Sequence, residues 1–184
     1  RFHNDHPVIV FVGRLTRTKR LDLILDAMKI LASRGVFPNL ALIGDGEARE
    51  ELALRVRRDG LDGRVWFLGA CYDEAILSEY LYHADVCVSP GNVGLTAIHA
   101  MTFGCPVITH DNFSLQMPEF EAIRPGVTGD FFEYENAGSL AETLLCWWAN
   151  NHDRRNVVRD VCRKEIAEKW NPYHQMNVLK EVLQ

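Results

Sequence analysis

The sequence SPGNVGLTAIHAM, residues 89–101, is predicted to join the end of a β-strand to the start of an α-helix through a glycine-rich turn. The run DVCVS that leads into this turn is short and apolar, and the residues after it repeat apolar side chains every three to four positions, as one face of a helix does. Pro90 cannot continue a central strand, and Gly91 and Gly94 allow sharp bends and the close approach of a ligand. The helix presents free N–H groups and its positive dipole end to the turn, which predicts an anion site with phosphate as the ligand.

The rest of the chain alternates apolar runs of strand length with amphipathic runs of helix length. Strands are expected at residues 8–12, 39–44, 65–68, 85–89, 106–109 and 130–132. Helices are expected at residues 21–34, 45–59, 73–83 and 95–103, with three more after residue 137. The alternation predicts an α/β, Rossmann-like fold: a doubly wound parallel sheet of about six strands with helices on both faces and extra C-terminal helices, in a single domain over residues 1–184.

This topology brings two distant segments to one edge of the sheet. In the strand order 3-2-1-4-5-6, the first and fourth strands are neighbours, and ligands bind in the crevice outside their carboxyl ends. Those ends are Gly13-Arg14 and the glycine turn, and Lys19 lies on the same loop as Arg14. Two cations that face a helix N-terminus suit a diphosphate, because each charge-assisted hydrogen bond contributes roughly 1.5–3 kcal/mol.

Composition and charge narrow the classes of partner. The 184 residues are 47% hydrophobic and 24% charged, and the net charge of −5 argues against nucleic acid, which favours a basic face. The chain has neither a run of apolar residues long enough to span a membrane nor a signal-peptide pattern, so a cytoplasmic location is expected. The odd number and wide spacing of the five cysteines favour buried thiols over a disulfide framework or a zinc site. They are Cys71, Cys87, Cys105, Cys146 and Cys162.

Five short motifs resemble, in order and spacing, the C-terminal domain of the GT-B fold, group 1 retaining glycosyltransferases. They are VFVGRL at 10–15 with Lys19, IGDG at 43–46, VWFLG at 65–69, Gly94-Leu95 with Ala100-Met101, and GCPV at 104–107. The resemblance spans residues 8–142, and the set is specific although each motif alone is weak. It implies that the chain binds the nucleotide half of a nucleoside-diphosphate sugar, usually UDP or GDP linked. It also implies an acceptor-binding N-terminal domain outside this sequence, and a full-length enzyme that can associate peripherally with the inner face of the membrane.

The resemblance assigns roles by position. Arg14 and Lys19 would be catalytic, stabilising the leaving diphosphate, with no cofactor and no metal ion needed. The amides of residues 94–96 would cap the diphosphate, residues 69–70 would lie against the base, and His99 occupies the ribose position. The donor-binding positions are Gly13, Gly69, Ala70, Gly91, Asn92, Gly94, Leu95, Thr96 and His99.

The chain departs from the family at two of these positions. The family typically carries two glutamates eight positions apart, one near the donor sugar and one at the ribose, and here those places hold Gly91 and His99. A carboxylate accepts two hydrogen bonds from a vicinal diol, whereas a neutral imidazole has one acceptor nitrogen. We therefore expect altered ribose recognition, with Asn92 as a replacement contact. Two alternatives stay open: a degenerate, non-catalytic nucleotide-binding or docking module, and a nucleotide-sugar epimerase of GT-B fold.

Other features have structural interpretations beside functional ones. Residues 44–46 (GDG) lack the third glycine of a dinucleotide fingerprint and are predicted to form a tight turn. Residues 110–111 (HD) are predicted to be a loop hydrogen-bonding pair, and Glu119 and Glu121 are expected to face solvent, with the donor sugar or the acceptor side as the alternative. Trp147 and Trp148 are predicted to lie in the core or at a domain contact. An apolar stripe on the last helix would pack on the partner domain: Tyr173, Met176, Leu179 and Leu183.

Overall fold

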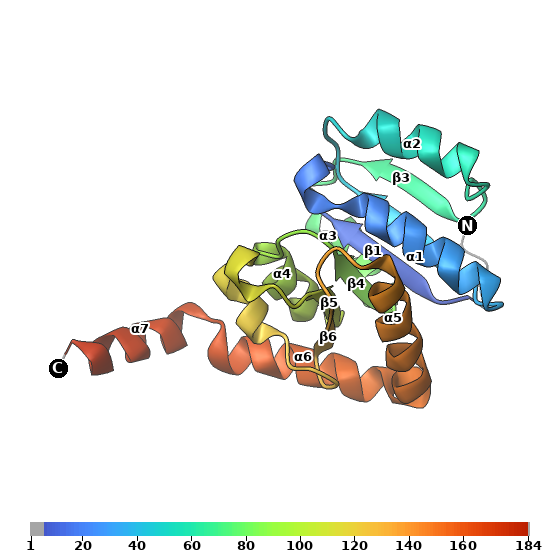
Figure 1. Cartoon of the computed structure of the whole chain (residues 1–184). Coiled ribbons are helices and arrows are strands. Elements are labelled where there is room, and N and C mark those ends of the chain that lie inside the picture. The colour runs from blue at the N-terminus through green and yellow to red at the C-terminus, as the bar shows by residue number, and fades with distance from the viewer. Residues whose placement is uncertain (1–5, 184) are drawn as a thin grey trace.

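The computed structural model describes residues 6–183, in which six strands form one parallel sheet (Figure 1). The strand order is β3-β2-β1-β4-β5-β6, which confirms the predicted doubly wound topology. Strands β1 and β2 pair over their whole length, and nearly all of their side chains are buried, as the continuous apolar runs predicted. The strands are β1 (Val8–Val12), β2 (Asn39–Ile43), β3 (Val65–Gly69), β4 (Val86–Ser89), β5 (Val107–His110) and β6 (Gly129–Phe132).

Helices cover both faces of this sheet (Figure 1). Helix α1 packs against α2 and α5, whereas α4 packs against α6. The strands lie between these two groups of helices (Figure 1). Asp73 caps α3, since its side chain accepts hydrogen bonds from the amides of Ala75 and Ile76. The helices are α1 (Leu21–Ser33), α2 (Arg49–Arg58), α3 (Glu74–His83), α4 (Leu95–Thr102), α5 (Ala137–Asn151), α6 (Arg155–Lys169) and α7 (Pro172–Val182). In the described part of the chain, no helix has the length and apolar character that crossing a membrane requires.

The start of α2 differs from the prediction. The helix begins at Arg49, four residues later than expected, because residues 45–48 form a turn that hydrogen-bonds to the loop after β1. Leu15 donates its amide to the carbonyl of Asp45 at 2.9 Å and accepts from the amide of Ala48 at 2.9 Å. A Cβ on Gly46 would lie 2.5 Å from the Leu15 carbonyl oxygen, so this close approach requires glycine. The tight-turn interpretation of the GDG sequence is therefore confirmed.

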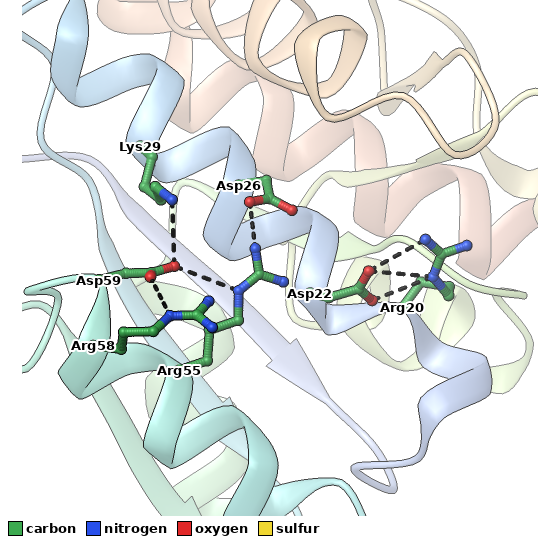
Figure 2. A network of polar contacts seen from close by, with 7 residues as sticks. All are labelled: Arg20, Asp22, Asp26, Lys29, Arg55, Arg58 and Asp59. Carbon is green, nitrogen blue, oxygen red and sulfur yellow. Dashed lines mark hydrogen bonds and ion pairs between the residues drawn. The ribbon is translucent and has the colours of Figure 1, made fainter.

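Charged side chains hold α2 against α1 (Figure 2). Helix α2 buries only Leu52 and Val56, so its docking depends on more than apolar contact. Asp59, at the end of α2, accepts from three basic side chains that converge on it: Arg58, Arg55 and Lys29. The hydrogen bond from Arg58 and the neighbouring positive charges lower the pKa of Asp59. The carboxylate therefore stays ionised, and the interaction weakens only as the pH falls through its lowered folded-state pKa.

Helix α7 extends from the end of α6 away from the sheet (Figure 1). Its boundary follows from Asn171, whose side chain caps the helix by accepting from the amide of His174, and from the proline that follows. The predicted apolar stripe is exposed, with Tyr173 80% and Leu183 84% accessible. Its packing on a partner domain stays a prediction. Trp147, in contrast, is buried in the core, and Trp148 packs against it, as the sequence indicated.

The cysteine prediction was partly wrong. Cys87, Cys105 and Cys162 are buried, and burial raises the pKa of the Cys87 and Cys162 thiols to about 12. Cys146, however, lies on the exposed side of α5, and Cys71 is only partly buried in the loop before α3. An apolar run around a cysteine does not reveal on which face of a helix the thiol lies.

Thiol labelling tests this division. With a soluble disulfide reagent at neutral pH, we expect Cys71 and Cys146 to react first, because their sulfurs meet water and the other three thiols stay protonated in the core. The remaining thiols should react only after denaturation. The Cys71→Ser/Cys146→Ser variant should lose the rapid phase. Rapid labelling of that variant in the folded state would contradict the described core.

Candidate functional site

The carboxyl ends of β1 and β4 lie next to each other because these two strands pair directly, with Val10 opposite Cys87. The loop after β1 carries Arg14 and Lys19, and the turn after β4 leads into α4. The Thr96 hydroxyl in the first turn of α4 donates to the carbonyl oxygen of Val12 at 3.3 Å. The structure thus brings together the two segments that the topology placed at one edge.

Lys19 is bonded to the glycine turn. Its Nζ donates to the carbonyl oxygen of Asn92 at 2.7 Å and to the side-chain Oδ1 of Asn92 at 3.0 Å. The main chains are joined as well, since the amide of Gly91 donates to the carbonyl of Lys19 at 3.0 Å. The short 3₁₀ helix Arg17–Lys19 aims the lysine at the turn. These hydrogen bonds hold the Lys19 ammonium at the turn that leads into the N-terminus of α4.

Arg14 supplies a second positive charge at this place. Burial, and after it the positive charge of the nearby Arg14 guanidinium, lower the pKa of Lys19. Arg14 itself is exposed. Within residues 6–183, neither cation forms an ion pair or hydrogen bond with a carboxylate. The loop therefore holds two positive charges that an anion from solution can neutralise.

The N-terminus of α4 is open. Gly94 is the N-cap residue, and no side chain in the described part of the chain caps the helix. Across the described chain, the amides of residues 94–96 have no hydrogen-bond acceptor. Leu95 is 74% exposed, so solvent reaches these donors. Free amides at the positive end of a helix dipole, beside two cations, form a suitable site for a phosphate group.

The first departure from the family pattern has a steric cause. A Cβ on Gly91 would lie 2.2 Å from the carbonyl oxygen of Thr18 and 2.7 Å from the Cα of Lys19. Real Cβ atoms do not approach backbone atoms so closely, so no side chain fits here unless one of the two loops moves. The glutamate expected at this position is incompatible with the contact that places Lys19 on the turn.

The second departure brings in a residue that the sequence did not reveal. His99 projects from α4, and its Nε2 lies 3.0 Å from Oε2 of Glu74, the first residue of α3. The Phe103 ring packs edge-on against the imidazole at 5.3 Å. The two partners lie 25 positions apart on different helices, so no local motif connects them. The available clue was topological, since α3 starts beyond the carboxyl end of β3, at the same edge of the sheet.

The predicted base-binding segment lies at this edge too, on the far side of β2 and β1 from the turn. The carbonyl of Gly69 accepts from the amide of Gly44 at 2.8 Å, and Ala70 is exposed. Gly13 directly follows β1, and its amide donates to the carbonyl oxygen of Ile43 at 2.9 Å. These residues line up from β3 to β4, and their roles in binding stay predictions.

The two glutamates left open by the sequence differ in their surroundings. Glu121 is exposed, whereas Oε2 of Glu119 is shielded from solvent and has no hydrogen-bond partner among residues 6–183. That oxygen lies near Gly94, 4.0 Å from where a Cβ would be. Gln116 holds this segment on the turn, because its Oε1 accepts from the amide of Val93 at 2.7 Å. Glu119 therefore faces the glycine turn.

The pair at residues 110–111 has the structural role predicted for it. Nδ1 of His110 accepts from the amide of Asn112 at 3.2 Å, and Asp111 accepts from the amide of Tyr134 at 3.0 Å. Burial lowers the pKa of His110, so the ring is neutral and able to accept. Among the described residues, no three His, Cys, Asp or Glu side chains gather as metal ligands would.

A cavity lies at the opposite edge of the sheet from the glycine turn. This cavity, of about 700 Å³, is lined by residues next to the amino ends of β1, β4 and β5, with Arg155, Arg159 and Trp148 on its wall. Ligands of doubly wound sheets bind at the carboxyl ends, where the glycine turn lies. The cavity is thus separate from the candidate site, although it too is basic.

The fold and this edge of the sheet correspond to a known class of enzymes. The sequence model of the family described as "Glycosyl transferases group 1" matches residues 6–150. The chain therefore belongs to the group 1 glycosyltransferases.

Individual relatives agree with this assignment. Mannosylfructose-phosphate synthase of Agrobacterium fabrum is 32% identical over 152 residues, which cover 75% of this chain and 32% of that protein. An uncharacterized glycosyltransferase of Methanocaldococcus jannaschii is 29% identical over 187 residues, 98% of this chain and 44% of its own length. The chain thus spans less than half the length of these relatives.

Solved structures share the fold. Sucrose-phosphate synthase from Thermosynechococcus elongatus has a TM-score of 0.80 and 26% identity, covering 99% of this chain and 46% of that one. The HepE protein of Anabaena, solved in complex with UDP, has a TM-score of 0.77 and 19% identity, covering 98% of this chain and 50% of its own.

Replacing Gly91 tests the close contact between the two loops. Gly91→Ala should lower the free energy of unfolding by about 1–3 kcal/mol, because the new methyl group overlaps the Thr18–Lys19 backbone. In thermal unfolding this corresponds to a melting temperature lower by roughly 2–4 °C per kcal/mol. Gly63→Ala is the matched control, since a Cβ there meets no atom of the described residues within 4 Å. Equal melting temperatures for the two variants would show that the loops do not pack as described.

Proposed function

We propose that this chain is the donor-binding half of a two-domain retaining glycosyltransferase. In the full-length enzyme, a sugar passes from a nucleoside diphosphate, UDP or GDP, to an acceptor held by an N-terminal domain. The observation that carries the proposal is the hydrogen bond of Lys19 to the glycine turn, beside Arg14 and the open amides of α4. Retention of configuration and the identity of the acceptor side rest on the family resemblance.

The chemistry assigned to this chain is stabilisation of the leaving group. As the bond between the sugar and the diphosphate breaks, negative charge grows on the phosphate oxygens. Arg14, Lys19 and the amides of residues 94–96 are fixed donors for that charge, and preorganised donors of this kind lower a barrier strongly. A bound diphosphate also offsets the repulsion and burial that lower the pKa of Lys19. Two cations supply the neutralisation, so the proposal includes no metal ion.

The nucleotide is proposed to lie along the edge of the sheet formed by the carboxyl ends of the strands. The base lies at Gly69 and Ala70, the ribose near His99, and the diphosphate at Gly94, with Gly13, Gly91 and Asn92 forming the floor between the loops. Proteins that share the fold support this class of ligand, since HepE was solved with UDP and with UDP-glucose.

The acceptor domain is proposed to dock on α7. The apolar stripe of that helix is exposed to water, and burying it against another domain would be favourable. The chain covers less than half the length of its relatives. Without the acceptor domain, this chain should bind nucleotide and leave the sugar untransferred. The five free thiols support a cytoplasmic location, and peripheral association with the inner membrane face is part of the same proposal.

A second candidate is a non-catalytic nucleotide-binding or docking module. The observation behind it is the absence of both family glutamates, at Gly91 and His99. A full-length protein that is inactive with every sugar donor, yet binds nucleotide, would favour this candidate over the enzyme.

Isothermal titration calorimetry with UDP, GDP and ADP tests the cation site. Arg14→Ala should weaken binding of the preferred nucleotide by roughly 10- to 100-fold, the effect of one lost charge-assisted hydrogen bond. Lys19→Ala should weaken it similarly. Among the described residues, the Arg14 side chain has no ion-pair or hydrogen-bond partner to lose, so a loss of affinity in that variant reports on the ligand.

Arg17→Ala is the matched control, because Arg17 is on the same loop but its side chain is 80% exposed and paired with Glu51. Its affinity should equal that of the unaltered chain. Absence of binding by all three nucleotides, or equal affinities for the Arg14→Ala, Lys19→Ala and Arg17→Ala variants, would remove the proposed function.

A further inference from the structure

The Glu74 carboxylate lies at the start of α3 and contacts His99 of α4. Asp73 fixes the first turn of α3 by accepting from the amides of Ala75 and Ile76, and Glu74 follows directly. His99 reaches it from α4, with 3.0 Å between Nε2 and Oε2. The Phe103 ring packs edge-on against the imidazole, with 5.3 Å between the ring centroids. Among the described residues, Oε1 of Glu74 has no partner, and the side chain is 69% exposed.

This carboxylate lies between the two parts of a nucleotide site. His99 is one helical turn after Leu95, about 6 Å along α4 from the amides that face the phosphate. Glu74 starts the helix that follows the end of β3, where Gly69 and Ala70 lie. In a nucleotide, the ribose connects the base to the phosphates. A ligand with its phosphate at α4 and its base at the end of β3 therefore brings its ribose to Glu74.

Glu74 and His99 differ in how many hydrogen bonds they can accept, and this gives them different roles. The 2′ and 3′ hydroxyls of a ribose present two donors side by side, and a carboxylate is able to accept both. An imidazole has at most one acceptor nitrogen, and the Nε2 of His99 already faces Glu74. The histidine is thus suited to hold the carboxylate, and the carboxylate is suited to bind the diol.

From this geometry we propose that Glu74 is the ribose-binding residue of this chain and that His99 is its positioning residue. The missing glutamate of α4 is replaced by a carboxylate from α3, which selects ribonucleotides over 2′-deoxyribonucleotides. The inference rests on the proposed function, since it requires that the site bind a nucleoside diphosphate.

Calorimetry with UDP and 2′-deoxy-UDP on the 184-residue chain tests the proposal. The unaltered chain should prefer UDP by about tenfold, the effect of one hydrogen bond to a charged acceptor. Glu74→Ala should weaken UDP binding about tenfold more than 2′-deoxy-UDP binding, because UDP loses two hydrogen bonds to the carboxylate and the deoxy form loses only that of its 3′ hydroxyl, so the preference disappears. Glu79→Ala is the matched control, an exposed glutamate of the same helix, and should keep the preference.

Variants of His99 test the positioning role. His99→Ala should reduce the preference about threefold, because the carboxylate loses its partner but not its charge. His99→Gln, which retains a donor toward Glu74, should restore the preference. In His99→Glu/Glu74→Ala the carboxylate moves onto α4, and the preference should return as well.

The outcomes separate this inference from the proposed function. If the unaltered chain binds neither nucleotide, the proposed function fails and the inference fails with it. If it binds UDP and 2′-deoxy-UDP equally, or if Glu74→Ala weakens both to the same extent, the ribose assignment is overturned while nucleotide binding stands. A preference that is lost in His99→Ala but kept in Glu74→Ala would assign the ribose contact to the histidine instead.

Discussion

The contact between the loop after β1 and the turn after β4 is the interaction on which the site depends. The ammonium of Lys19 binds the carbonyl and the side chain of Asn92, while the amide of Gly91 binds the carbonyl of Lys19. The two loops are thereby joined by main chain and side chain together. The contact places a positive charge in front of α4 and leaves its first amides free, which is the arrangement that an anion requires.

The same contact explains why the chain departs from its family. The backbone of Thr18 and Lys19 lies so close to Gly91 that a side chain has no space there. Two carboxylates from other elements lie around α4: Glu74 at the start of α3, which contacts His99, and Glu119, whose shielded oxygen lies near Gly94. The proposed substitute for the family glutamate is the first of these.

The sequence was sufficient for the sheet order, because strands and helices alternate and β-branched runs mark the central strands. Topology alone also brought Lys19 to the glycine turn. The start of α2 was missed, since residues 45–48 bond to Leu15 across the sheet edge and local periodicity carries no record of that bond. Glu74 was missed for a similar reason: its meeting with His99 depends on how two helices lie side by side. The exposure of Cys146 depends on the rotation of α5 against the core. In each case the information lies in tertiary contacts between segments distant in sequence.

A nitrogen-15 correlation NMR titration with UDP locates the diphosphate on the chain, because each backbone amide gives its own signal. We expect the largest shifts at the amides of residues 94–96, with smaller ones at Lys19 and Gly91. We expect unchanged signals around the cavity lined by Arg155 and Arg159, at the opposite edge of the sheet. Shifts concentrated at that cavity, with residues 94–96 unaffected, would contradict a phosphate site at the start of α4.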